Sequence, residues 1–204
     1  GELRFEGEHL PPIAKLAPNN TVLLGSFSKT VVPAFRLGWM LVPDWLRKKV
    51  TIAKQATDLH SNAFSQQVLH RFLTDHSLDA HLEKIKEVYG RQRAAMEAAL
   101  SRHCPPGVSY TRPEGGMFLW LTLPASISAM KLFDEAIKEK VAFVPGAPFY
   151  VRPEIQNTLR LSFVTASEEQ IRSGIAALAA AVREALPRPA AVPVARPMTP
   201  GVTA

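Results

Sequence analysis

The chain has 204 residues, 47% hydrophobic and 21% charged, a composition typical of a folded globular protein and not of a disordered, collagen-like or coiled-coil chain. The longest apolar runs, such as residues 37–42, are far shorter than the roughly 20 residues of a membrane span, so we expect no membrane partner. Residues 1–16 are charged and contain proline, and we expect no signal or transit segment. The single cysteine, Cys104, excludes an internal disulfide framework and favours a reducing compartment, by default the cytoplasm.

The net charge of +6 comes from 24 Lys and Arg against 18 Asp and Glu. The basic residues are spread along the chain and mostly stand near acids, as in Glu83, Lys84, Lys86 and Glu87. Such mixtures are typical of a solvated helix face, so we expect no nucleic-acid partner. The six histidines show no spacing with carboxylates that would suggest a metal site, and we expect none.

Two apolar runs of strand length, residues 21–25 and 37–42, come first, and a polar, turn-like stretch joins them. Because both runs are continuously apolar, we expect strands that are buried on both faces. Three helices follow over residues 44–58, 62–74 and 77–102, and the last of them is ended by Pro105, Pro106 and Gly107.

The second half of the chain has a different pattern. It predicts short strands over residues 108–111, 117–123 and 158–164, with a helix over 129–140. A final helix starts at Ser167, where Ser167 and Gln170 form a capping box. Its expected buried face consists of Ile171, Ile175, Leu178, Val182 and Leu186.

These elements predict an α/β protein of two parts. An α/β part covers residues 1–76, a linking helix covers 77–107, and a small α+β domain covers 108–186. Residues 187–204 hold five prolines and no periodic apolar stripe, so we expect a disordered tail there.

The candidate reactive and ligand-binding residues follow the first predicted strand. Lys29 lies at the end of that strand, where α/β folds place ligands. Taken alone, such a lysine is most often an ordinary surface residue. Here the hydroxyls of Ser26 and Ser28 stand beside it, and Arg36 follows seven residues later. Hydroxyls and a guanidinium fork suit a phosphate group, and a reactive amine beside a phosphate site favours pyridoxal phosphate as cofactor.

With these residues in place, the chain resembles the class I/II pyridoxal-phosphate aminotransferases, which have the fold of aspartate aminotransferase, a fold-type I enzyme. The seven-residue step from Lys29 to Arg36 is similar to the 2-aminoadipate and kynurenine aminotransferase branch. Six segments carry the resemblance: GELRFEGEHLPP at the start, GSFSKTVVPAFRLGW from residue 25, AKQATDLHSN from 53, RPEGGMFLWLTLP from 112, VAFVPGAPFY from 141 and NTLRLSF from 157.

The resemblance implies that Lys29 is the catalytic residue and forms a Schiff base with the cofactor, whose phosphate Ser26, Ser28 and Arg36 bind. Arg160 would bind the α-carboxylate of the substrate. The implied reaction is transamination between an L-amino acid and a 2-oxo acid of the 2-oxoglutarate type, by a homodimer. The family's Gly-rich phosphate loop, ring-stacking aromatic residue and pyridine-binding Asp all precede the GELRF motif. We therefore expect this chain to be the C-terminal half of such an enzyme, with the end of the large cofactor-binding domain in residues 1–76.

The residues around Arg160 support its role independently of the family. In Leu159-Arg160-Leu161-Ser162-Phe163 the three apolar side chains share one face of a strand, so Arg160 and Ser162 point the other way. The simpler alternative is an arginine on a solvated strand face.

One segment departs from the family. The usual Pro-Gly-Leu-Arg before the phosphate-binding arginine is here Pro33-Ala34-Phe35-Arg36. Because alanine enters the positive-φ region only at a cost, we expect a slightly different turn that still binds phosphate.

Two other functions fit the same motifs. One is an effector-sensing domain of a winged-helix transcription regulator, since such domains also retain the lysine and the phosphate arginine. The segment 53–62 and the Arg160 motif favour the enzyme. The other is a folded protein without catalysis.

Overall fold

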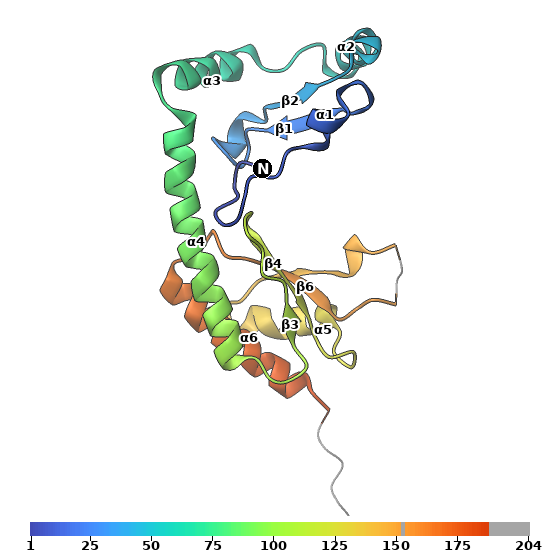
Figure 1. Ribbon diagram of the computed structural model, residues 1–204. Coiled ribbons are helices and arrows are strands. Elements are labelled where there is room, and N and C mark those ends of the chain that lie inside the picture. The colour runs from blue at the N-terminus through green and yellow to red at the C-terminus, as the bar shows by residue number, and fades with distance from the viewer. Residues whose placement is uncertain (152–153, 188–204) are drawn as a thin grey trace, which may run out of the picture.

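The computed structural model describes residues 1–151 and 154–187, and the predicted tail therefore lies outside the described residues, apart from Pro187. Two lobes are joined by the long helix α4 (Leu78–His103), as Figure 1 shows. We call residues 7–75 the N-terminal lobe and residues 104–187 the C-terminal lobe. The division of the chain into domains at residues 76 and 107 remains a prediction.

The N-terminal lobe is built around an antiparallel pair of strands, β1 (Leu23–Ser26) and β2 (Gly38–Leu41), in which Ser26 lies opposite Gly38. The connection between them contains a short 3-10 helix, η2 (Pro33–Phe35). The other elements of this lobe are α1 (Ile13–Leu16), η1 (Pro18–Asn20), α2 (Asp44–Asp58) and α3 (Ala63–Asp75).

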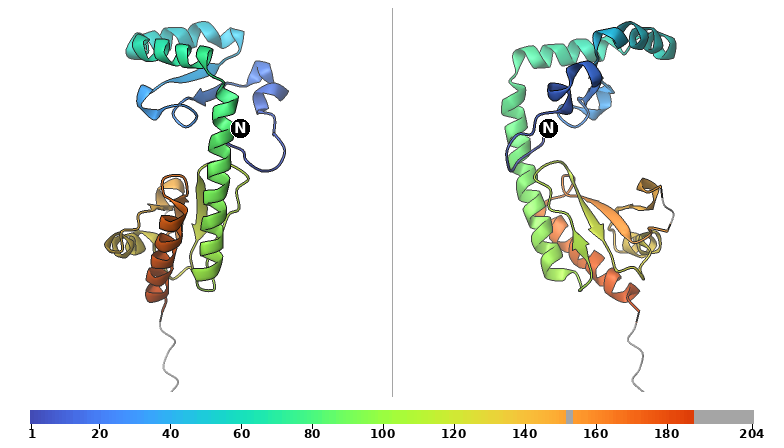
Figure 2. Two further views of the ribbon diagram at one scale, coloured as in Figure 1. Left: turned by 90° about the vertical axis from the view of Figure 1, so that its left-hand side faces the viewer. Right: turned by 45° about the vertical axis from the view of Figure 1, so that its right-hand side comes forward.

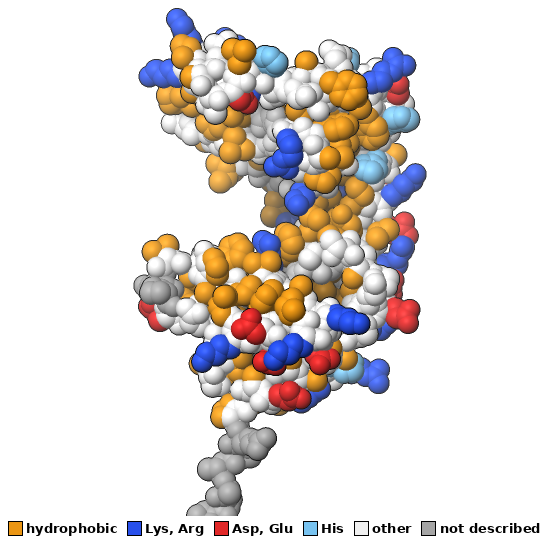
Figure 3. Space-filling model, turned by 180° about the vertical axis from the view of Figure 1, so that it is seen from behind, with side chains coloured by type: hydrophobic (Ala, Val, Ile, Leu, Met, Phe, Trp, Pro, Cys, Tyr) orange, Lys and Arg blue, Asp and Glu red, His pale blue; other side chains and the backbone are white. Residues whose placement is uncertain are grey.

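The expectation that both strands are buried on both faces is wrong. Leu24 on β1 is 69% exposed and Trp39 on β2 is 41% exposed, and every residue of β2 is exposed. The physical reason is that this sheet has only two strands, so among the described residues no third strand or flanking helix covers both of its faces. Exposed apolar side chains continue onto α2, at Trp45 and Ile52, and Figure 3 shows apolar side chains spread over this lobe.

Local capping signals place the ends of the helices. The Asn62 side chain accepts a hydrogen bond from the backbone N–H of Ser65, and Ser77 does the same for Ala80 at the start of α4. These caps satisfy N–H groups that have no partner inside the helix. The predicted helices over 44–58, 62–74 and 77–102 are confirmed to within about one residue at each end.

The C-terminal lobe has a four-stranded antiparallel sheet in the order β3-β4-β6-β5. Helix α4 and the final helix α6 run side by side against it, as both views of Figure 2 show. The elements of this lobe are β3 (Ser109–Tyr110), β4 (Phe118–Thr122), α5 (Ala129–Lys138), β5 (Val144–Pro145), η3 (Ala147–Phe149), β6 (Thr158–Ser162) and α6 (Glu168–Ala185).

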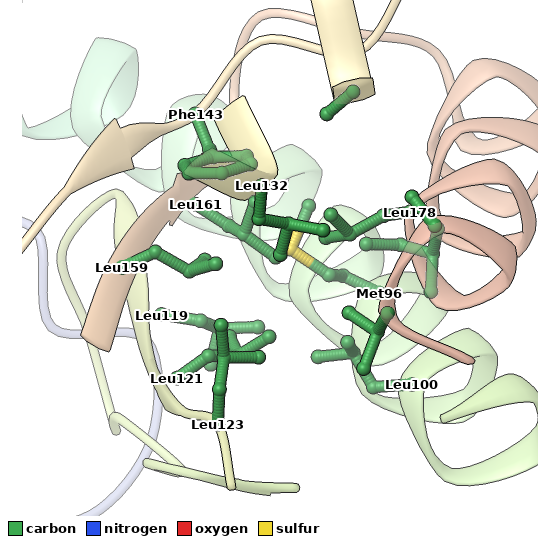
Figure 4. Close-up of a cluster of buried hydrophobic side chains, with 14 of the residues drawn as sticks. Met96, Leu100, Leu119, Leu121, Leu123, Leu132, Phe143, Leu159, Leu161 and Leu178 are labelled. Carbon is green, nitrogen blue, oxygen red and sulfur yellow. The ribbon is translucent and has the colours of Figure 1, made fainter. Parts of the chain in front are cut away.

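The core of the molecule lies in this lobe, between one face of the sheet and the helices (Figure 4). Leu119 and Leu121 of β4 and Leu159 and Leu161 of β6 point into it. The predicted capping box of α6 is confirmed, since Ser167 Oγ accepts from the Gln170 N–H at 3.2 Å and Gln170 Oε1 from the Ser167 N–H at 2.9 Å. In the described part of the chain, no helix combines the length and the apolar character that crossing a membrane requires.

Candidate functional site

The loop that presents Lys29 is a tight turn at the end of β1. The carbonyl of Phe27 accepts hydrogen bonds from the N–H groups of Val31 (2.9 Å) and Val32 (3.0 Å), and the Phe27 N–H donates to the carbonyl of Leu37 at 3.2 Å. These bonds close the turn over residues 27–32 and tie it to the start of β2. Lys29 lies within this turn with its side chain exposed.

The two serines flank this turn. Ser26 is the last residue of β1, and its Oγ accepts a hydrogen bond from the backbone N–H of Ser28 at 3.2 Å. Such serine turns fix the direction of the following residues. Ser26 is exposed and Ser28 half-buried, so the Ser26 side chain is accessible to a ligand at the turn that carries Lys29.

Arg36 ends η2 in the left-handed region, with φ 53° and ψ 37°. The N–H of Arg36 donates to the carbonyl of Pro33 at 3.3 Å, and so does Nη1 of its side chain. Ala34 lies inside the 3-10 helix, so the alanine is not the residue with positive φ. A non-glycine residue in this region costs roughly 1 kcal/mol, and such strain is concentrated at functional sites.

The turn depends on the glycine that precedes Ser26. A Cβ atom on Gly25 would lie 2.0 Å from Cε2 of Trp39, because the indole ring of this β2 residue lies over the Gly25 backbone. Only glycine fits there without displacing Trp39.

The donors around this turn suit an anionic ligand that carries an aldehyde. They consist of two hydroxyls, one ammonium group and one guanidinium group, and within the described residues no carboxylate forms an ion pair with Lys29 or Arg36. Hydroxyl and guanidinium donors bind phosphate, and a lysine amine condenses with an aldehyde. The donor set therefore fits pyridoxal phosphate.

Arg160 lies in the other lobe, at the centre of β6, where it pairs with Trp120 of β4 and Val144 of β5. Its strand neighbours Leu159 and Leu161 are buried in the core while Arg160 and Ser162 are half-buried, so the predicted alternation is confirmed. A cavity of about 230 Å³ opens on this face, lined by Phe118, Ala142, Phe143, Val144, Arg160 and Ser162.

Two aromatic rings flank the Arg160 guanidinium. Its Cζ lies 4.1 Å from the ring centre of Phe118 and 5.3 Å from that of Phe149. Sequence reasoning missed both residues, although the alternation along β4 could have placed Phe118 on the face of Arg160. Ser26, Ser28, Lys29 and Arg36 all lie between the end of β1 and the start of β2, whereas no described contact joins Arg160 to the turn of Lys29.

Residues 3–6, which we call the N-terminal clasp, lie against the C-terminal lobe. The N–H groups of Phe5 and Glu6 both donate to the carbonyl of Glu114 at 3.0 Å, and the N–H of Gly116 donates to that of Leu3 at 2.9 Å. Arg93 of α4 binds both carboxylate oxygens of Glu6.

The electrostatics of the clasp follow from this contact. The hydrogen bonds and the positive charge of Arg93 hold the pKa of Glu6 below its ordinary value. The Phe5 ring packs edge-on against Phe163 of the core, with 6.3 Å between ring centres. The clasp therefore combines apolar and ionic contacts with the C-terminal lobe.

Other reactive groups form no site. Burial raises the pKa of the Cys104 thiol, an effect that the charge of Arg183 partly opposes, so this cysteine is not a ready nucleophile. Across residues 1–151 and 154–187, no three His, Cys, Asp or Glu side chains group so as to hold a metal ion.

Comparison with known proteins places the chain among aminotransferases. The sequence profile described as aminotransferase class I and II matches residues 2–178. An aromatic-amino-acid aminotransferase of Thermococcus litoralis is 42% identical over 185 residues, which are 90% of this chain and 44% of that protein. A 2-aminoadipate transaminase of Thermus thermophilus is 39% identical, over 89% of this chain and 47% of its own length.

Solved structures agree with the sequence relatives. The kynurenine aminotransferase of Pyrococcus horikoshii, solved in complex with PMP, superposes with a TM-score of 0.87 at 42% identity, over 92% of this chain and 47% of that chain. A transcriptional regulator of the helix-turn-helix type from Bacillus subtilis matches more weakly, at 30% identity over 85% of this chain and 36% of its own length.

The chain spans about half the length of the aminotransferases that it matches. The superposition covers 92% of this chain, which confirms the predicted α/β fold class. A profile match over most of the chain, together with identities near 40%, confirms the predicted family. The chain belongs to the class I and II aminotransferases.

Proposed function

We propose that the complete protein is a pyridoxal-phosphate-dependent aminotransferase that moves an amino group between an L-amino acid and a 2-oxo acid of the 2-oxoglutarate type. The observation that carries this proposal is the connection between β1 and β2, which carries Lys29, two serine hydroxyls and Arg36, and among the described residues no carboxylate forms an ion pair with Lys29 or Arg36. Membership of the family supports the reaction class.

Each of these residues has a distinct task. When bound, pyridoxal phosphate supplies an electron sink for the bonding electrons of the substrate Cα–H bond. The Lys29 amine would take the proton from the substrate Cα as a base and deliver it to the C4′ carbon of the cofactor as an acid. Ser26, Ser28 and Arg36 hold the phosphate, and Arg160 orients the substrate through its α-carboxylate, because a guanidinium fork binds both carboxylate oxygens.

The proposal extends to the assembly and its location. We expect a homodimer of the complete protein, with this chain forming the end of the large domain in residues 1–76 and the small domain in 108–186. The single cysteine favours the reducing cytoplasm. The relatives act on aromatic amino acids, 2-aminoadipate and kynurenine, so a panel of aromatic, acidic and branched donors with 2-oxoglutarate would identify the preferred substrate.

Substitution of Lys29 tests the reaction. In the full-length protein loaded with pyridoxal phosphate, we expect Lys29→Ala to abolish turnover and the visible absorbance of the lysine-bound cofactor. Borohydride reduction followed by peptide mass spectrometry would find the cofactor attached to Lys29 in the wild type. Lys48→Ala on the exposed surface of α2 is the matched control and retains activity. Full transaminase activity in Lys29→Ala would contradict the proposal.

The match to transcriptional regulators makes a sensing domain the second candidate function. A winged-helix domain encoded upstream of residue 1, together with specific DNA binding that pyridoxal phosphate alters, would support it. Transamination by the full-length protein without such a domain would exclude it.

A further inference from the structure

Arg160 has no acidic partner among the residues that the structure describes. Across the described residues, no ion pair or hydrogen bond to its guanidinium occurs, and its Nε is buried without an acceptor. The Arg160 side chain is half-buried, and even partial burial of an unpaired charge is costly. Its surroundings must therefore compensate for the lost hydration in another way.

The aromatic rings supply that compensation. The ring centres of Phe118 and Phe149 lie 4.1 and 5.3 Å from Cζ of Arg160, within the range of a cation–π interaction. A ring face attracts the cation through its quadrupole, without using an N–H group as a hydrogen-bond donor. A carboxylate partner would instead occupy the guanidinium fork that a substrate carboxylate needs.

The rings are themselves held in place. Phe118 lies on β4 opposite Ser162, so it is the diagonal neighbour of Arg160 on the same face of the sheet. Phe149 ends η3 and packs edge-on against Trp120, with 5.5 Å between ring centres. Trp120 is the direct cross-strand partner of Arg160, so Arg160, both phenylalanines and Trp120 form one connected group.

Neither phenylalanine is buried in the hydrophobic core. Phe118 is 37% exposed and Phe149 is 55% exposed, whereas Leu119 and Leu121 of the same β4 strand are buried in the core. The part of an aromatic side chain that stays in contact with water adds nothing to hydrophobic stabilisation. Their position against Arg160 calls for a different explanation.

We propose that Phe118 and Phe149 are positioning residues, which hold the Arg160 guanidinium by contact with their rings and leave its N–H donors free for the substrate α-carboxylate. This inference rests on the proposed carboxylate-binding role of Arg160. It predicts that loss of either ring weakens binding of carboxylate substrates while the chemical step proceeds at its normal rate.

The test uses Phe118→Leu and Phe149→Leu in the full-length, cofactor-loaded enzyme, with 2-oxoglutarate as the probe. We expect Kd from calorimetry and KM for 2-oxoglutarate to rise by about threefold to tenfold for each variant, the range that corresponds to one cation–π contact. We expect kcat to change by less than about twofold, because substrate and transition state lose the same contact. Phe118→Tyr and Phe149→Tyr keep a ring face and are expected to restore wild-type affinity.

Phe133→Leu is the matched control. This phenylalanine of α5 packs against Phe143 and the core, with 5.4 Å between ring centres, so its loss lowers the melting temperature and leaves 2-oxoglutarate affinity unchanged. Wild-type affinity in both leucine variants, or an equal loss of affinity in Phe133→Leu, would overturn the inference. Phe149 is more than half exposed, so we expect Phe149→Leu to fold. Its 2-oxoglutarate affinity tests the inference even if Phe118→Leu fails to fold.

Arg160→Lys separates this inference from the proposed function. If Arg160→Lys binds 2-oxoglutarate as tightly as the wild type, Arg160 is not the carboxylate ligand, and both the proposed role of Arg160 and the inference fall. If Arg160→Lys weakens binding and the two leucine variants do not, only the positioning role falls.

Discussion

Replacing Arg93 with methionine tests how the N-terminal clasp is held, since Arg93→Met removes the guanidinium and keeps an unbranched stem. The Arg93 side chain is 10% exposed. Its Nη1 donates to the carbonyl of Pro113 at 2.7 Å and to Glu6 Oε2 at 2.9 Å. Its Cζ also lies 5.1 Å from the ring centre of Phe5. One side chain therefore joins α4, the clasp and the loop before β4.

The magnitude follows from these contacts. A hydrogen bond from a charged donor contributes about 1.5 to 3 kcal/mol, and its loss leaves the half-buried Pro113 carbonyl without this partner. The pair with Glu6 contributes about 1 kcal/mol or less, because the Glu6 side chain is 53% exposed and water screens the charges. Glu97 Oε1, 3.7 Å from Arg93 Nε, also loses its cation. We expect Arg93→Met to lower the free energy of unfolding by about 3 kcal/mol.

Equilibrium urea denaturation measures this loss. The matched control is Arg91→Met on the same helix, whose side chain is largely exposed and pairs with Glu87, and it should change stability by less than about 0.5 kcal/mol. A double-mutant cycle with Glu6→Gln should give a coupling energy of about 1 kcal/mol. Equal stability of Arg93→Met and Arg91→Met, or a coupling energy of zero, would refute the assignment of Arg93 as the anchor of the clasp.

The remaining predictions concern pH and the turn of Lys29. The hydrogen bonds and the charge of Arg93 hold the folded-state pKa of Glu6 below its ordinary value. The ionised Glu6 carboxylate therefore contributes its full stabilisation at pH values above its pKa in the unfolded chain. This stabilisation is lost as the pH falls through the pKa of Glu6 in the folded protein. The free energy of unfolding, measured against pH, should therefore fall less on acidification in Glu6→Gln than in the wild type. An equal fall in both proteins would contradict the pairing of Glu6 with Arg93. Gly25→Ala would place a Cβ 2.0 Å from Trp39 Cε2 and should weaken cofactor binding to the full-length protein, seen by absorbance titration. Gly174→Ala, where the nearest atom lies at 3.8 Å, should bind the cofactor normally, and equal binding in the two variants would show that the turn tolerates a Cβ.

Features determined by neighbouring residues were predictable from the sequence. The caps at Ser77 and Ser167 mark helix starts because a serine oxygen binds N–H groups only three residues away. The placement of Arg160 opposite the core follows from the two-residue period of a strand. The apolar run before Lys29 predicts a strand, and Lys29 lies in the turn that follows β1.

Contacts between distant parts of the chain were not predictable in this way. The exposure of β1 and β2 depends on which elements flank them in space, and a continuous apolar run does not encode this. The contacts of Arg160 with Phe118 and Phe149 join three separate segments, and the pair of Glu6 and Arg93 spans 87 positions. Periodicity and motif spacing describe only one segment at a time.

The clasp bears on how the two lobes can move. Residues 3–6 lie on the C-terminal lobe, yet the chain continues from Gly7, at φ 72°, to the N-terminal lobe. The junction of α3 and α4 at His76 forms a second connection. Because the chain crosses between the lobes at both places, any rotation of one lobe against the other must be accommodated by backbone torsions in both connections while the clasp stays bound.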